Sequence, residues 1–125
     1  MHRSRPAGFM IDCQGGELSA STTFWREALA LPVVDPDEGA AGRHAVFGPG
    51  GLHVDVQQVD HPSRVHLDIE TDDLEAEVSR LEAPGGRGIA CARRRWWVME
   101  APTGHRVCVV PMRDAAGRAP ANVWT

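Results

Sequence analysis

The chain has 125 residues, enough for one domain with a hydrophobic core, since a chain of this length buries roughly two-thirds of the surface that its unfolded form exposes. Its net charge of -4 argues against a nucleic-acid partner, which would need a clustered basic face. Three cysteines without paired spacing make neither a disulfide framework nor a zinc knuckle, and no segment approaches the roughly 20 apolar residues of a membrane span, so we expect a cytoplasmic protein with reduced thiols.

The first half of the chain predicts one strand, one helix and then further strands. In chain order these are a strand at 9–13, a helix that starts near Ser19 or Ser21, a short edge strand at 31–34, and a hairpin of strands at 43–47 and 52–59. The helix carries Phe24, Ala28 and Leu31 on one side, with Trp25 and Leu29 beside them. We expect that side to face the core.

The second half repeats this order more clearly. It predicts a strand at 65–70, a helix at 72–83, strands at 88–92 and 96–100, and a last strand at 105–111 after a tight turn. Leu74, Val78 and Leu81 recur at helical spacing, and Thr71 is available as the N-cap. An approximate repeat of this kind predicts two similar units that share a cleft. The tail beyond 113 is either loose or docks through Val123 and Trp124.

Alternation along the strands separates an apolar parity from a polar one. The apolar parity contains Phe9, Ile11, Cys13, Val54, Val56, Leu67, Ile69, Val107 and Val109. The polar parity contains Met10, Asp12, His53, Asp55, Gln57, His66, Asp68, Glu70, Arg106 and Cys108. This second face is either the lining of a wet, concave site or the solvent side of an ordinary antiparallel sheet.

The segments HLDIETDDLEAEVSRLEAPGG and WWVMEAPTGHRVCVV, together with the repeated order of elements, resemble the vicinal oxygen chelate (glyoxalase/bleomycin resistance/dioxygenase) superfamily and, within it, small bacterial glyoxalase-like domains. The resemblance implies a single α+β domain of two βαβββ modules, about 7–59 and 64–112, with a loose tail at 113–125. It also implies pseudo-twofold symmetry, a U-shaped mixed sheet with a concave cleft, and a homodimer.

The resemblance further implies where a metal would bind, with a ligand from the first and the last strand of each module. Matched residue by residue, these positions fall on Gly8 or Met10, on Gln57, on His66 and on Cys108. Glycine and methionine are not usual ligands of a divalent ion, and a thiol stands where glutamate is usual. We therefore expect no metal. The alternative is zinc on His66 and Cys108, with Gln57 or His53 as the third ligand.

Without a metal, the chemistry open to the cleft is proton transfer. His66 could act as general acid or base beside Asp68, Asp55 or Glu70, and Cys108 could act as a nucleophile activated by His66.

Further candidates for binding a ligand are Gln57, Arg106, His53, Asp55, and either Trp96 or Trp97. Only one of the two tryptophans can face the cleft, because neighbours in a strand point to opposite sides. Arg106 suits a carboxylate or phosphate, whereas the acidic residues favour a cation, so the charge of the ligand stays open.

These observations predict a glyoxalase-like protein that binds a small molecule, with no nucleic acid and no membrane as partner. The first expectation is a metal-independent acid/base catalyst. One alternative is a metal-dependent lyase or isomerase that uses His66. Another is a drug-sequestering protein of the bleomycin-resistance kind, whose site needs aromatic walls and few polar groups.

Overall fold

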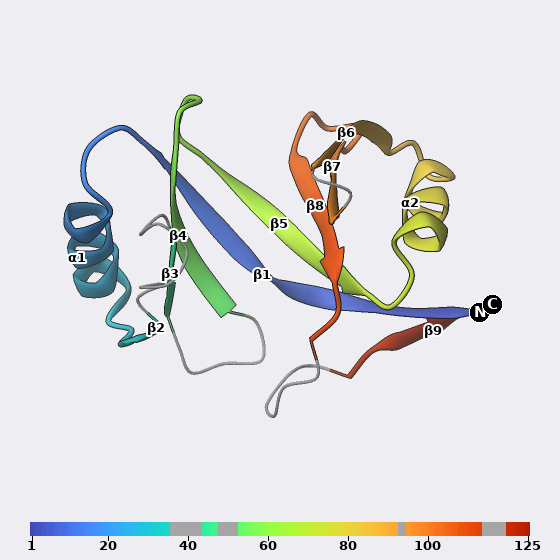
Figure 1. Ribbon diagram of the computed structural model, residues 1–125, viewed down its shortest axis with the longest axis horizontal. Coiled ribbons are helices and arrows are strands. Elements are labelled where there is room, and N and C mark those ends of the chain that lie inside the picture. The colour runs from blue at the N-terminus through green and yellow to red at the C-terminus, as the bar shows by residue number, and fades with distance from the viewer. Residues whose placement is uncertain (36–43, 48–52, 93–94, 114–119) are drawn as a thin grey trace. The chain divides into compact units, whose positions relative to one another are not determined.

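The computed structural model describes residues 1–35, 44–47, 53–92, 95–113 and 120–125 (Figure 1). Residues 36–43, 48–52, 93–94 and 114–119 lie outside the described residues, and with them the turn of the predicted first hairpin. The chain forms two compact units. We call Gly8–Val65 the first-module unit, and Met1–Ala7 with His66–Thr125 the second-module unit. Among the described residues, no helix is long and apolar enough to cross a membrane.

The first-module unit contains strands in the order β2-β3-β4-β1. Its elements are the second part of β1 (His2–Gln14), then α1 (Leu18–Leu29), β2 (Val33–Asp35), β3 (His44–Phe47) and β4 (His53–Val59). β1 runs parallel to β4, whereas β2, β3 and β4 are antiparallel neighbours. α1 lies against β3 and β4 (Figure 1).

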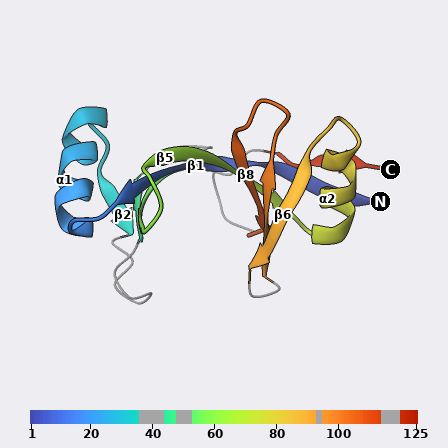
Figure 2. The same cartoon turned by 90° about the horizontal axis from the view of Figure 1, so that it is seen from above.

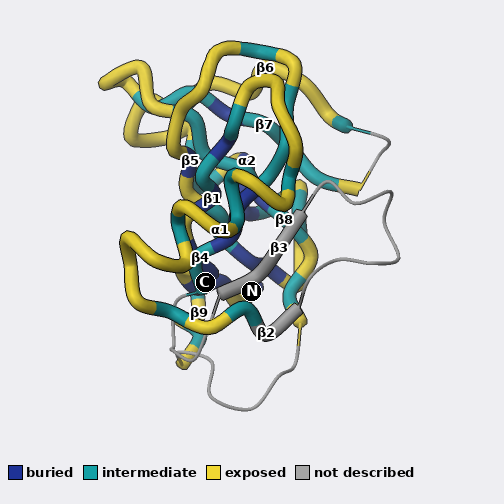
Figure 3. Tube along the Cα trace, turned by 90° about the vertical axis from the view of Figure 1, so that its left-hand side faces the viewer, coloured by how far each residue is buried: buried dark blue, intermediate teal, exposed yellow. Residues whose placement is uncertain are grey.

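Helix α1 faces the sheet with a different side from the predicted one. Its half-buried residues are Leu18, Ser21, Thr22 and Trp25, which recur at helical spacing. Phe24 and Ala28 are exposed, and Figure 3 shows α1 without a buried residue. The prediction that Phe24 and Ala28 face the core is therefore wrong. The helix starts at Leu18, earlier than predicted. This start adds Leu18 to the residues on the Trp25 side of the helix.

The second-module unit contains strands in the order β9-β1-β5-β8-β7-β6. Its elements are the first part of β1, most of β5 (Arg64–Thr71), then α2 (Leu74–Glu82), β6 (Arg87–Ala92), β7 (Trp96–Glu100), β8 (Arg106–Pro111) and β9 (Asn122–Trp124). β5 and β8 are parallel, and β6, β7 and β8 are antiparallel neighbours. Both units thus contain a strand, a helix and three further strands, and the predicted α+β class is confirmed.

The core of the second-module unit lies between α2 and β7 and β8. Val78 of α2 packs with Met99 and Val109, and the partly buried Leu81 and Trp97 pack around them. Figure 2 shows α2 beside this part of the sheet. The helical spacing seen in the sequence therefore corresponds to one buried face of α2.

The first residues of the chain form a strand that the sequence did not predict. β1 begins at His2 and not at residue 9. Its polar side chains find acidic partners far along the chain: His2 Nε2 lies 2.7 Å from Glu77 Oε2, Arg3 Nε 3.0 Å from Asp72 Oδ2, and Arg5 Nε 3.0 Å from Glu70 Oε2. A polar strand is therefore stabilised by ion pairs rather than by an apolar face.

Glu77 is the most buried of these acids, with no exposed side-chain surface. Burial alone would raise the pKa of Glu77, but hydrogen bonds from Arg80, His2 and Ser4 outweigh it and hold the pKa below its ordinary value of 4.5. The Arg80 guanidinium binds both carboxylate oxygens, at 2.6 and 2.9 Å. Glu77 is thus ionised inside the unit.

The C-terminal residues are also ordered onto this unit, contrary to the expectation of a loose tail. Asn122–Trp124 form β9, which pairs antiparallel with His2–Ser4. Trp124 Nε1 donates to Ser4 Oγ at 2.7 Å, and the Arg80 guanidinium lies 4.0 Å from the Trp124 ring centre. Val123 is exposed, so Trp124 alone of the two predicted residues docks.

The polar parity of the strands is more buried than the apolar one in several places. Asp12, Asp55 and Glu70 are each about 97 to 98% buried, whereas Phe9 and Leu67 are each 41% exposed. The reading of this face as the solvent side of the sheet is therefore wrong. The shared cleft and the pseudo-twofold axis remain predictions.

Candidate functional site

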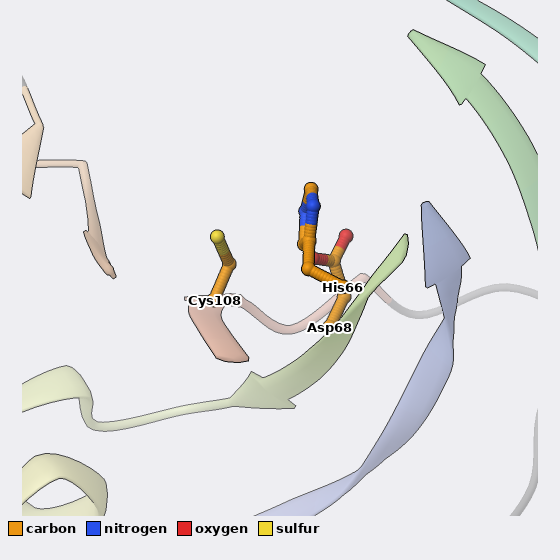
Figure 4. A group of neighbouring side chains, drawn as sticks. All are labelled: His66, Asp68 and Cys108. Carbon is orange, nitrogen blue, oxygen red and sulfur yellow. The ribbon is translucent and has the colours of Figure 1, made fainter. Parts of the chain in front are cut away.

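Three side chains with metal-binding or proton-transferring groups meet on one face of the second-module unit. His66 and Asp68 project from β5, and Cys108 projects from β8, where it is the register partner of Asp68 (Figure 4). One nitrogen, oxygen and sulfur atom from these residues lie within 4.8 Å of one another. We call these three residues the His66 cluster.

The members of the His66 cluster are close without being fully hydrogen-bonded to each other. His66 Nε2 lies 3.4 Å from Asp68 Oδ1, beyond a good hydrogen bond. The side chains of both residues are about nine-tenths buried, at 10% and 14% exposed. Asp68 Oδ1 is buried and makes no hydrogen bond to any described residue. A buried carboxylate oxygen of this kind needs a cation or a proton beside it.

The geometry fits a zinc ion. Zinc bonds of the usual length to nitrogen, oxygen and sulfur place tetrahedral ligands roughly 3.3 to 3.6 Å apart. The His66 to Asp68 distance of 3.4 Å matches that edge, and the donor atoms of all three residues lie within 4.8 Å of one another. A thiolate, an imidazole and a carboxylate together favour zinc over magnesium or manganese.

At the first-strand position of the first module, neither candidate offers a usual metal ligand. A Cβ atom at Gly8 would overlap the carbonyl oxygen of His53 and stand 2.9 Å from its Nδ1, so no side chain fits at position 8. Met10 is buried and offers only a thioether. Within the described residues of the second-module unit, the third possible donor beside His66 and Cys108 is Asp68, and the sequence-based choice of Gln57 or His53 stays a prediction.

A pair of arginines shares one carboxylate on the same face as the His66 cluster. Arg106 Nη1 lies 2.7 Å from Glu100 Oε2, and Arg87 Nη2 lies 3.0 Å from Glu100 Oε1. Val98 of β7 is the register partner of Cys108 of β8. Two residues further along β7, Glu100 is the register partner of Arg106. Because alternate residues of a strand share a face, Arg106 stands next to Cys108 on β8. Sequence reasoning missed Glu100, although a hairpin closed by the turn at 101–105 would pair it with Arg106.

The two adjacent tryptophans lie on opposite faces of β7. Trp97 packs against the core below α2, and its Nε1 lies 3.3 Å from Glu75 Oε1. Trp96 has the parity of Val98 and Glu100 and therefore shares the face of the His66 cluster. Trp96 is thus the aromatic residue available to a ligand there.

The remaining candidates belong to the first-module unit. His53 Nδ1 lies 2.6 Å from Asp55 Oδ1, which fixes the imidazole with its Nε2 pointing away from the carboxylate. Asp55 is buried, and Gln57, two residues further along β4, is half-buried. That these three side chains join the His66 cluster in one cleft stays a prediction.

Comparison with known proteins places the chain in a family. Residues 8–110 match the model of a family described as a glyoxalase-like domain, so the chain belongs to that family. No curated protein matches.

Solved structures share the fold at low sequence identity. A variant of the Streptomyces coelicolor methylmalonyl-CoA epimerase, in complex with 2-nitronate-propionyl-CoA, has a TM-score of 0.61 and 18% identity over 93% of this chain and 98% of that one. A hypothetical protein from Bacillus halodurans C-125 has a TM-score of 0.63 and 13% identity, over 90% and 97% of the two chains. A glyoxalase/bleomycin resistance protein/dioxygenase superfamily member from Vibrio splendidus 12B01 has a TM-score of 0.53 and 15% identity, over 87% and 99%. These similarities establish the fold alone.

Proposed function

We propose that the protein binds a small organic molecule at the His66 cluster and transforms it in a lyase or isomerase reaction supported by a zinc ion. The observation that carries this proposal is the meeting of a nitrogen, an oxygen and a sulfur donor within 4.8 Å on one face. The buried, unsatisfied Asp68 Oδ1 supports it further, because a cation at that point would compensate the carboxylate.

The three residues have distinct roles in this proposal. His66 and Cys108 bind through a neutral imidazole and a thiolate, so loading the site releases protons. Asp68 supplies the third ligand and balances charge. The chemistry that zinc supplies at such a site is polarisation of a substrate oxygen. Trp96 and Val98 give the organic part of the ligand an apolar contact surface on the same face.

Metal analysis tests this proposal directly. We expect the full chain, dialysed after exposure to zinc, to retain about one ion per chain, and the cobalt-substituted protein to show a sulfur-to-cobalt charge-transfer band. His66→Ala and Cys108→Ser should each abolish both signals. Cys91→Ser is the matched control, because Cys91 is exposed on β6. Equal retention by Cys108→Ser and the control would contradict the proposal.

A metal-free acid/base catalyst is the second candidate, favoured by the closeness of His66 Nε2 to Asp68 Oδ1. The imidazole would then accept a proton from a carbon acid while Asp68 stabilises the imidazolium. Chelator-treated protein should in that case still exchange solvent deuterium into a small 2-oxo acid, and His66→Gln should not. Binding of such acids without exchange under either condition would instead indicate sequestration without turnover.

We also propose that the protein is a cytoplasmic homodimer. Exposed apolar side chains support association, since Phe24, Val65 and Ile89 are each more than two-fifths exposed in a single chain. Light scattering at high micromolar concentration should give twice the mass of the chain. A strictly monomeric mass would contradict the dimer and leave the metal proposal untouched.

A further inference from the structure

The charges beside the His66 cluster bear on what kind of ligand the site takes. Arg87 and Arg106 share a single carboxylate, that of Glu100, so this group of three carries one net positive charge. We call Arg87, Glu100 and Arg106 the arginine pair with its shared acid. Glu100 and Arg106 are each less than one-third exposed, which reduces solvent screening of their charges.

Arg106 has unused hydrogen-bond donors. A guanidinium presents five N–H groups, and among the described residues Arg106 contacts only Glu100, through Nη1. Its planar fork suits two oxygens of a carboxylate or phosphate. By contrast, Arg80 and Arg5 are used in buried ion pairs with Glu77 and Glu70.

The position of Arg106 relative to Cys108 sets the scale of the ligand. Two residues along one strand are separated by roughly 6.7 Å, and side chains of the same parity project to the same face. A ligand whose charged group binds Arg106 therefore places a reacting atom a few bonds away over the His66 cluster. A short organic acid or a small phosphate ester has that length.

Asp68 of the His66 cluster does not cancel the preference of Arg106 for an anionic ligand when zinc is bound. Zinc carries two positive charges, and Asp68 with the Cys108 thiolate carries two negative ones. The net positive charge of the arginine pair with its shared acid then remains as the uncompensated charge on this part of the face. Glu100 is the register partner of Arg106, whereas Asp68 is the register partner of Cys108, two residues further along β8.

We infer that Arg106, assisted by Arg87, forms a subsite for the anionic group of the ligand, and that the protein acts on a small oxyanion. This inference rests on the proposed function, because it assigns the substrate class of the same site. Glu100 is its internal counter-ion and competes with the ligand for both guanidinium groups.

Three variants, Arg106→Ala, Glu100→Gln and the control Arg95→Ala, test the subsite on the zinc-loaded full chain. The ligands are inorganic phosphate, acetate and neutral acetamide, added at constant ionic strength. Binding is followed by NMR through the arginine Nε–H and tryptophan Nε1–H signals. Arg106→Ala should weaken phosphate and acetate binding about tenfold or more, since it removes charge-assisted hydrogen bonds. Glu100→Gln should strengthen both severalfold, because it frees the two guanidinium groups. Acetamide binding should not change. Phosphate and acetate distinguish an ester from an organic acid as the preferred oxyanion.

Arg95→Ala is the control for net charge, because Arg95 is exposed and precedes Trp96 without a side-chain contact among the described residues. Equal losses in Arg106→Ala and Arg95→Ala, or no tightening in Glu100→Gln together with no loss in Arg106→Ala, would overturn the subsite. The cobalt spectrum separates the two proposals. A normal spectrum without Arg106-dependent anion binding refutes the subsite alone, whereas Arg106-dependent binding without a metal spectrum refutes the zinc proposal alone.

Discussion

At the scale of single residues, Glu77 is a fully buried acid that pairs with both His2 and Arg80. Its carboxylate accepts hydrogen bonds from His2 Nε2 and from Nε and Nη2 of Arg80, although it is completely buried. The pKa of Glu77 is lowered in the folded state, so its contribution to stability is fully present above the unfolded pKa and is lost as the pH falls through the folded value.

Glu77→Gln should therefore destabilise the protein by about 3 kcal/mol at pH 7, because it leaves the buried His2 and the Arg80 guanidinium without their carboxylate. The difference from wild type should shrink as the pH is lowered below 4.5, because the unfolded wild-type chain then binds a proton at Glu77 that the folded state, with its lowered pKa, still excludes. Urea unfolding at a series of pH values measures this. Glu82→Gln, an exposed change on the same helix, should have little effect.

Gly8 is required for a packing reason and not for its backbone freedom. A Cβ atom there would overlap the backbone of His53 on the neighbouring strand. Gly8→Ala should cost about 3 kcal/mol or more, or prevent folding, since backbone atoms cannot move aside cheaply. Gly16→Asn is the control, because Gly16 has a positive φ of 69° but open space around it, and should cost less than about 1 kcal/mol. Equal unfolding midpoints for the two variants would refute this reading.

The site residues could be predicted only in part. Alternation in the sequence grouped His66, Asp68 and Cys108 on one face, and the structure brings these three together. It could not identify Asp68 as the donor beside Cys108, because that depends on the register of two strands about 40 positions apart. The sequence showed that Trp96 and Trp97 point to opposite faces of a strand. Which of them faces α2 depends on how β7 pairs with its neighbouring strands.

At the scale of elements, the start of α2 differs from the prediction in an instructive way. Asp73, and not Thr71, is the N-cap, and its carboxylate accepts from the backbone N–H of Ala76 at 3.1 Å. Thr71 Oγ1 instead donates to the backbone oxygen of Arg3. The same hydroxyl oxygen accepts from the backbone N–H of Asp73 at 3.1 Å, so Thr71 links the start of α2 to the first part of β1 without being the N-cap.

Asp73→Ala should destabilise the protein by about 1 kcal/mol through loss of the cap, whereas Asp73→Asn should retain most of the stability. Thermal unfolding of the two variants against wild type measures the difference. If both variants lose the same amount, the charge and not the hydrogen bond of the cap would be responsible.

Elements with local signals were predicted well, and elements stabilised by distant partners were not. β7 spans the predicted residues, because two turns bound it and its aromatic and branched residues favour a strand. The first part of β1 has no such signal, since HRSRPA is polar and contains proline. Its strand state depends on Glu77, Asp72 and Glu70, which are more than 60 positions away.

At the scale of the whole molecule, both ends of the chain are held by the second-module unit. Trp124 contacts Ser4 through a hydrogen bond and Arg80 through its ring. Trp124→Ala should lower the free energy of unfolding by about 2 kcal/mol, through loss of a half-buried aromatic side chain and a cation–π contact. Val123→Ala, an exposed change in the same strand, should have little effect on the melting temperature. Similar losses for both would point to the strand itself rather than to Trp124.

The pairing of His2 with Trp124 makes the order of synthesis matter for folding. The residues His2–Ser4 pair with residues more than a hundred positions later in the chain, so the first strand is synthesised long before its partner, although the N and C labels lie side by side in Figure 1. Closing so long a loop slows folding. A circular permutant with the two ends joined by a short linker, and new ends opened between the exposed Gly15 and Gly16, turns this pairing into a local hairpin and keeps the β7–β8 hairpin intact. We expect it to refold faster than the natural chain.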